Sequence, residues 1–187
     1  MSFLINVLAP KQLEVLHEIV PKAKSIGVLV NPDNPYAGTD TNEVQRAADL
    51  LGLEVVLLNA RTETDLDAAF AELTSKRVGG LVVVSDALMF DRRSQIAALA
   101  SRHAMPTIYP LRDFVAAGGL ISYGSSITDA FRLQGVFVGQ ILKGAKPTEL
   151  PVQQSTKVEL VINLKAAEIL GLTVPLSLIG RADEVIE

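Results

Sequence analysis

An apolar run from Ser25 to Val30 stops at Asn31-Pro32, and a second Asn-Pro pair, Asn34-Pro35, follows directly behind it. The run is short, aliphatic and partly β-branched, which predicts a strand buried on both faces. Proline restricts the residue before it to extended or turn conformations, so the strand must give way to a loop. A helical pattern begins near Thr39. This arrangement places polar groups at the carboxyl end of a strand, where open α/β folds bind ligands.

The same arrangement recurs along the chain. Short apolar runs alternate with segments whose apolar residues recur every three or four positions. We predict strands over 25–30, 53–58, 79–85, 107–109 and 120–123, and helices over 12–20, 39–51, 63–75, 92–102 and 111–116. Such alternation is typical of βαβ units, so we expect an α/β fold with a parallel sheet flanked by helices. Beyond this part, the pattern predicts a longer helix over 128–142, a strand over 158–162 and a helix over 163–170.

Composition excludes several classes of protein. The chain has 187 residues, of which 49% are hydrophobic and 20% charged, so a folded core is expected. Its net charge of −4 and its scattered Lys and Arg residues argue against a nucleic-acid surface. It has no cysteine and two distant histidines, and we predict no metal site. No apolar stretch is long enough to span a membrane, and Met1 to Asn6 lacks the features of a signal peptide.

Polar residues gather in four loops that follow predicted strands. These loops contain Asn31, Asp33, Asn34 and Tyr36; Ser85 and Asp86; Tyr109, Arg112 and Asp113; and Ser122, Tyr123, Ser125 and Ser126. Each residue alone has a simpler explanation, because Asn-Pro pairs mark turns and Asp or Ser caps helices. In a parallel sheet, however, the loops converge on one edge. Together they supply amides, hydroxyls, carboxylates, a guanidinium and aromatic rings, which suits reversible binding of a small polar ligand.

Sequence motifs for catalysis are absent. The chain has no GxSxG elbow, no GxxxxGK[ST] loop and no GxGxxG fingerprint. His103 lies near a helix end, where a cation interacts well with the helix dipole, and His17 lies within a helix pattern. We therefore predict no catalytic residues and no cofactor.

Several sequence blocks carry a resemblance to a known family. They are Leu8–Lys11, Val20–Ala23, Gly27–Pro32, Tyr109–Val115, Gly118–Gly124, Ile141–Pro147, Val161–Ala167 and the tail from Leu170 to Ile186. With them, the chain resembles bacterial ABC-transporter substrate-binding proteins related to the tryptophan/tyrosine-type binding proteins.

The resemblance implies a fold and a role. Its fold would be a periplasmic-binding-protein type I-like lobe, one of two α/β lobes that close over a small ligand. Its role would be periplasmic binding without catalysis and delivery of the ligand to an ABC permease. On that analogy, the candidate ligand contacts are Asn31, Asn34, Asp86, Tyr109 and Tyr123.

The resemblance also divides the chain. Members of the family have an amino-terminal lobe and an export signal before the block at Ser2–Leu4, so we expect this chain to be truncated. Residues 1–118 would form the carboxy-terminal lobe, 119–150 a returning segment that normally packs on the first lobe, and 151–187 the closing strand, helix and tail. The helix over 128–142 is apolar around much of its circumference, so we expect it to pack on a second copy in a homo-oligomer. The alternative is that it covers its own sheet.

Two other functions remain open. A ligand-sensing domain of the same fold, as in sugar-responsive repressors, would need an output module. An α/β enzyme with an unrecognised site would need an acid–base cluster at the strand ends.

Overall fold

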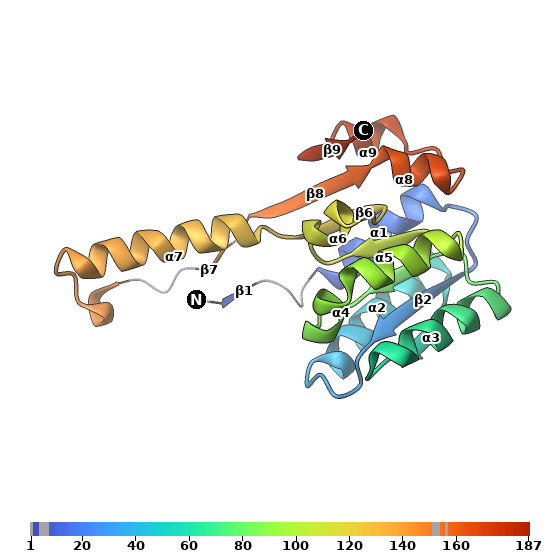
Figure 1. Ribbon diagram of the computed structural model, residues 1–187, viewed down its shortest axis with the longest axis horizontal. Coiled ribbons are helices and arrows are strands. Elements are labelled where there is room, and N and C mark those ends of the chain that lie inside the picture. Colours follow the sequence, from blue (N-terminus) through green and yellow to red (C-terminus); the bar gives the residue numbers. More distant parts are fainter. Residues whose placement is uncertain (1, 4–7, 151–153, 156) are drawn as a thin grey trace.

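A mostly parallel sheet forms the centre of the protein (Figure 1). The computed structural model describes residues 2–3, 8–150, 154–155 and 157–187. Its strands are β1 (Ser2–Phe3), β2 (Ser25–Val30), β3 (Glu54–Asn59), β4 (Leu81–Val83), β5 (Thr107–Tyr109), β6 (Ile121–Ser125), β7 (Gln154–Ser155), β8 (Val158–Asn163) and β9 (Glu184–Ile186). Its α-helices are α1 (Ala9–Ile19), α2 (Ala37–Leu51), α3 (Glu63–Ser75), α4 (Ala87–Asp91), α5 (Arg93–Arg102), α6 (Arg112–Ala116), α7 (Ile127–Leu142), α8 (Leu164–Ile169) and α9 (Leu176–Ile179), with a 3₁₀ turn at Pro147–Glu149.

The main sheet has the strand order β3-β2-β4-β5-β6-β8-β9. The first five strands of this order run parallel, which confirms the predicted α/β fold. The sheet is mixed at one edge, because β8 is antiparallel to β6 and β9 is parallel to β8. The chain leaves the sheet at the carboxyl end of β6, passes through α7 and returns at the same edge. It must therefore run back along β6 in the opposite direction.

Helices cover both faces of the sheet. One layer, with α1, α2, α8 and α9, packs on residues such as Ile26, Val28 and Ile108. The other, with α3, α4, α5 and α6, packs on alternate residues such as Leu29, Leu81 and Val83. Because successive side chains of a strand point to opposite faces, an apolar run such as Ser25–Val30 fits only a strand covered on both sides.

Local sequence signals set most of the helix bounds. Helix α3 begins at a capping box in which Thr62 and Asp65 satisfy each other's backbone N–H groups. Helix α2 ends at Gly52 in the left-handed conformation, which glycine adopts without steric cost. The predicted helix over 92–102 begins one residue later, at Arg93, and the separate short helix α4 precedes it. None of the helices in the described part of the chain is long and apolar enough to cross a membrane.

An arm projects from this body (Figure 1). It consists of α7 and the parallel pair β1 and β7, and it leaves the body where Ser126 N–H donates to the Lys157 carbonyl (2.9 Å). Ala130 is the one buried residue of α7, so this helix does not cover its own sheet as the alternative required. Strand β6 belongs to the main sheet and α7 does not. The division of the chain at residues 118 and 119 stays a prediction.

Gly124 on β6 provides a test of this packing. A Cβ at this position would overlap the Pro110 carbonyl oxygen and lie 2.7 Å from the Pro110 carbonyl carbon. Backbone atoms cannot move aside as a flexible side chain can, so we predict that Gly124→Ala lowers the free energy of unfolding by about 3 kcal/mol in urea denaturation. Gly38→Ala in α2 is the control, because nothing lies within 4 Å of its Cβ position. It should lose no stability, whereas a Gly124→Ala protein as stable as wild type would contradict this packing.

Candidate functional site

The carboxyl ends of β2 and β4 lie at the point where the order of the sheet reverses. Strand β2 pairs with β3 on one side and with β4 on the other. The connections through α2 and α3 pass over opposite faces, so the loops after β2 and β4 diverge. Ligands of open α/β sheets bind in the crevice at such a switch point. The polar loops predicted from the sequence, after Val30 and after Val84, both lie there.

Three of the predicted site residues meet at this point. The Asn31 amide Nδ2 donates to Asp86 Oδ1 at 3.2 Å, and the Asn34 amide Nδ2 donates to Asp86 Oδ2 at 2.9 Å. Asn34 Nδ2 also donates to the Ser85 carbonyl at 3.2 Å. The loops after β2 and β4 are therefore tied together across more than 50 residues of sequence. We call Asn31, Asn34 and Asp86 the amide–carboxylate cluster.

The same side chains also shape their own loops. Asp33 N–H donates to Asn31 Oδ1 (3.1 Å), and Tyr36 N–H donates to Asn34 Oδ1 (2.9 Å). Each asparagine thus uses its oxygen for a local turn and its nitrogen for the neighbouring loop. Asp86 caps α4 by accepting from Leu88 N–H at 2.8 Å. The turn and cap explanations are correct for these residues, and the contacts between the loops are additional to them.

The Asp86 carboxylate is hydrogen-bonded only to amide groups among the described residues. Its carboxylate accepts from Asn31, Asn34 and Leu88, all of them uncharged donors. The side chain is half-buried, and within the described ranges it makes no ion pair with Lys or Arg. Tyr36 follows the same loop and leaves 58% of its surface exposed. The edge therefore presents a partly buried negative charge and an accessible aromatic ring.

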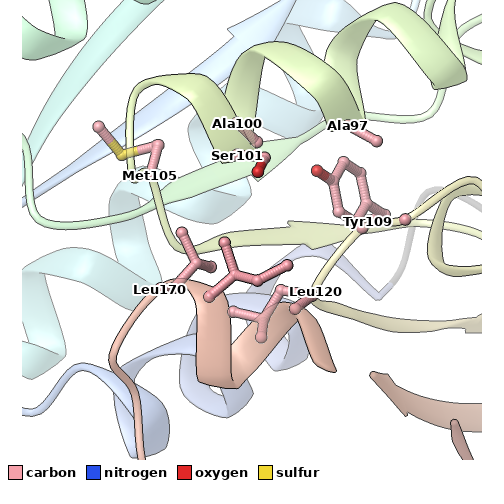
Figure 2. A pocket seen from close by; sticks show the side chains of 11 residues that line it. Ala97, Ala100, Ser101, Met105, Tyr109, Leu120 and Leu170 are labelled. Carbon is pink, nitrogen blue, oxygen red and sulfur yellow. The ribbon is translucent and has the colours of Figure 1, made fainter. Parts of the chain in front are cut away.

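Tyr109 lies elsewhere, in the core (Figure 2). It is the last residue of β5, but its side chain is fully buried in the α3–α6 layer, and its ring stacks on Phe114 with centroids 5.0 Å apart. Burial raises the pKa of its hydroxyl, and the nearby Thr107 side chain offsets only a smaller part of this effect. The sequence shows that Tyr109 ends a strand. Successive side chains of a strand point to opposite faces, and that of Tyr109 points into the core.

A small cavity adjoins Tyr109. Its labelled lining in Figure 2 comes from α5 (Ala97, Ala100 and Ser101), from the loops before β5 and β6 and from the residue after α8. Its volume of about 30 Å³ suffices for a water molecule but not for an amino acid. Asn31, Asn34 and Asp86 do not line it, so it is not the predicted ligand site.

Tyr123 lies on β6 in the opposite layer. Its ring is half-buried against the α1–α2 core, and its carbonyl accepts from Gln12 Nε2 at 2.8 Å. The two tyrosines thus point into different layers and are not brought together with the cluster. Contact of either with a ligand stays untested, and burial favours a packing role for Tyr109.

A polar recess lies at the base of the arm, where the sequence analysis predicted no ligand site. It has a volume of about 360 Å³ and is lined by Arg112, Ser126, Thr128, Asp129, Arg132, Lys157 and Glu159. The Arg112 guanidinium donates to both oxygens of Glu184, at 2.9 and 2.7 Å, and this ion pair raises the pKa of Arg112. Arg112 stood in a predicted loop, but its partner lies on β9, which the sequence pattern did not predict. The described residues contain no group of three acidic or histidine side chains that could hold a metal.

Asp40 is the most perturbed carboxyl group near this edge. It lies in the first turn of α2, directly after the Asn31–Tyr36 loop, and it is buried with one oxygen unpartnered among the described residues. Burial, with a smaller effect of the Glu43 carboxylate, raises the pKa of Asp40 to about 6. The fold therefore favours the neutral form of this group.

Comparisons with known proteins identify the family and agree with the fold. A family model described as ABC transporter substrate binding protein matches residues 6–186. A tyrosine-binding protein of Clostridioides difficile is 25% identical over 153 residues, which are 82% of this chain and 44% of that protein. Two solved structures have a TM-score of 0.82 and are matched over 95% of this chain and 60% of theirs. They are an ABC domain in complex with L-Trp from Streptococcus pneumoniae, 28% identical, and a conserved domain protein from Vibrio cholerae, 26% identical. The chain spans less than two thirds of the length of each of these proteins.

The raised pKa of Asp40 predicts a pH-dependent stability. The folded pKa of about 6 lies above the unfolded value of 3.8, so the stabilisation of the neutral form is complete below pH 3.8 and is lost as pH rises through 6. Asn cannot ionise. We therefore predict that the free energy of unfolding of Asp40→Asn rises relative to that of wild type between pH 4 and pH 7, by on the order of 3 kcal/mol.

Urea unfolding of both proteins at several pH values measures this gain. Asp49→Asn, which removes an exposed carboxylate from the same helix, is the matched control and should show no such trend. A constant difference between Asp40→Asn and wild type across this pH range would refute the burial argument.

Proposed function

Since this chain belongs to the family of ABC transporter substrate-binding proteins, we propose that it binds a small amino-acid-like ligand at the carboxyl edge of its sheet. The amide–carboxylate cluster at the switch point is the observation that carries this proposal. It lies where the fold binds ligands, and the hydrogen bonds that tie its loops together hold it in place before any ligand arrives.

The ammonium group of the ligand pairs with Asp86. The carboxylate has room for more than its three amide donors, because two ionised oxygens offer about four acceptor sites. A cationic donor would satisfy it more strongly than another amide, since charge-assisted hydrogen bonds are about twice as strong as neutral ones. Asn31 and Asn34 hold the Asp86 carboxylate in a fixed direction for this contact.

Tyr36 supports an aromatic amino acid as the ligand. Its exposed ring follows the loop that contains Asn31 and Asn34, and it offers a surface on which another ring can stack. Two similar proteins point in the same direction, since one is called tyrosine-binding and the other was solved with L-Trp.

The proposed role is solute binding for import. The protein captures its ligand outside the cytoplasmic membrane, passes it to an ABC permease and catalyses no reaction. A second lobe facing this edge, as expected for the family, completes the binding cleft. These statements rest on family membership and on the greater length of the relatives, of which this chain covers 44% and 60%.

Calorimetric titration with L-Trp and L-Tyr tests the proposal. We predict that the 187-residue chain binds at least one of them and that Asp86→Asn weakens binding by tenfold or more, because the charged pair becomes a neutral hydrogen bond. Asp67→Asn removes an exposed carboxylate on α3 and should bind as wild type does. Titration with the N-acetylated amino acid, which lacks the ammonium group, should give equally weak binding to wild type and to Asp86→Asn.

Two results would refute the proposal. One is the absence of binding to any amino acid by the wild-type chain. The other is unchanged affinity in Asp86→Asn while that variant keeps the unfolding midpoint of wild type.

A further inference from the structure

A groove lies at the amino edge of the sheet, where the parallel strands begin. It has a volume of about 710 Å³ and is formed by the loops before β2, β4 and β5 and by the residues after α8. Half-buried apolar residues of its walls include Val20, Pro106 and Leu172. The arm leaves the body at the opposite edge, after β6, so a second lobe that faces the carboxyl edge would leave this groove open (Figure 1). We call it the amino-edge groove.

Four exposed cations surround the amino-edge groove. Lys22 lines it, and Lys24, Arg77 and Arg102 each lie within two residues of its lining. None of the four forms an ion pair with an acidic side chain in the described ranges. None of the described residues that line the groove is acidic. The chain as a whole has a net charge of −4, so this edge differs in sign from the rest of the protein.

The acidic residues beside the groove do not cancel this charge. Glu18 pairs with Arg181 at 2.6 Å, and Glu72 pairs with Lys76 at 2.7 Å. Glu168, two residues before the lining residues after α8, is exposed and makes no ion pair with a described residue. Four unpaired cations therefore stand against one unpaired carboxylate, and the groove attracts anionic groups.

Arg77 has a left-handed backbone conformation, with φ of 54°. It follows the C-cap of α3, where the Val78 N–H donates to the Leu73 carbonyl at 3.1 Å, as in the Schellman helix ending. Glycine is the usual residue at this position because a side chain is strained there. The arginine therefore makes the fold less stable than glycine would.

Other helix ends of this chain follow the usual rule. Gly52, Gly144 and Gly171, which follow α2, α7 and α8, all have positive φ. Ala104, after α5, is the other non-glycine residue with positive φ in the described part of the chain, and it lines the amino-edge groove. Both strained residues thus lie at this groove. Backbone strain of this kind clusters at functional sites.

We propose that the amino-edge groove binds an acidic peptide segment of a partner protein. Apolar side chains of the segment contact the walls of the groove, and its carboxylates pair with Lys22, Arg77 and Arg102. A guanidinium can bind a carboxylate through two parallel hydrogen bonds, which an uncharged residue cannot replace. A groove formed by several loops admits the side chains of a peptide, whereas a membrane surface is flat and contacts only residues that project.

This binding is independent of the proposed solute binding. Asn31, Asn34 and Asp86 lie at the carboxyl edge and do not line the amino-edge groove. Calorimetric titration with L-Trp and L-Tyr measures the candidate ligand site separately, so the failure of one proposal is distinguishable from the failure of the other.

Fluorescence anisotropy with a labelled peptide of alternating glutamate and leucine tests the proposal. The peptide should bind the 187-residue chain, and its affinity should fall as salt is added, because salt screens exposed charges. Two altered peptides, one with glutamine for glutamate and one with glycine for leucine, should bind at least tenfold more weakly. The double variant Lys22→Gln with Arg77→Gln should also raise the dissociation constant at least tenfold. Arg46→Gln is the matched control, because it neutralises an exposed arginine that does not line the groove, and it should bind as wild type does.

Arg77→Gly separates binding from folding. Its urea unfolding midpoint should rise, because glycine adopts the left-handed conformation without strain. Its affinity for the peptide should nevertheless fall as far as that of Arg77→Gln. A purely structural role for Arg77 would instead leave the affinity unchanged in both variants.

Three results would overturn the proposal. The first is that the wild-type chain does not bind the glutamate–leucine peptide. The second is that the double variant Lys22→Gln with Arg77→Gln binds it with unchanged affinity. The third is that the wild-type chain binds vesicles containing phosphatidylglycerol but not the peptide, which would assign the same cations to a membrane surface.

Discussion

The burial of parallel strands on both faces is the constraint from which the rest of this structure follows. Parallel strands need crossover connections, and here those connections are helices that cover the sheet in two layers. Strand β2 lies in the interior of the main sheet, with β3 on one side and β4 on the other, so the order reverses between β2 and β4. That reversal opens the edge at which the loops of Asn31 and Asp86 face each other. The location of the candidate site is thus a consequence of how the sheet is buried.

The amide–carboxylate cluster combines structural and functional roles in the same side chains. Asp86 caps α4, and Asn31 and Asn34 form local turns, yet their remaining hydrogen-bonding atoms meet between the two loops. Buried or half-buried polar groups are rarely left unpaired, so a network of this kind fixes the loops rigidly. Rigid loops lower the entropy lost when a ligand binds. Asp86 shows that a residue that caps a helix can also belong to a candidate binding site.

The arm differs from the body in the way its apolar residues are used. In the body, helices such as α1 and α3 bury one face against the sheet. In α7 the apolar residues surround the helix, and all but Ala130 retain solvent exposure. The arm is also the reason for the mixed sheet, since the chain that leaves after β6 must return at the same edge as β8. One excursion therefore explains both the antiparallel edge and the exposed helix.

Local patterns in the sequence determined the strands from β2 to β6, their alternation with helices and the polar loops at their ends, because burial and turn formation depend on neighbouring residues. The parallel order predicted that the loops of Asn31, Asn34 and Asp86 share one edge of the sheet, and the pairing of β2 with β4 in the tertiary structure joined them. Long-range contacts had no such local signal. Tyr109 points into the core because of its position in the strand's alternation, and Arg112 finds Glu184 on a strand at the far edge of the sheet. Only the tertiary structure decided these placements, along with the direction of β8 and the exposure of α7, since each depends on what lies across the sheet rather than along the chain.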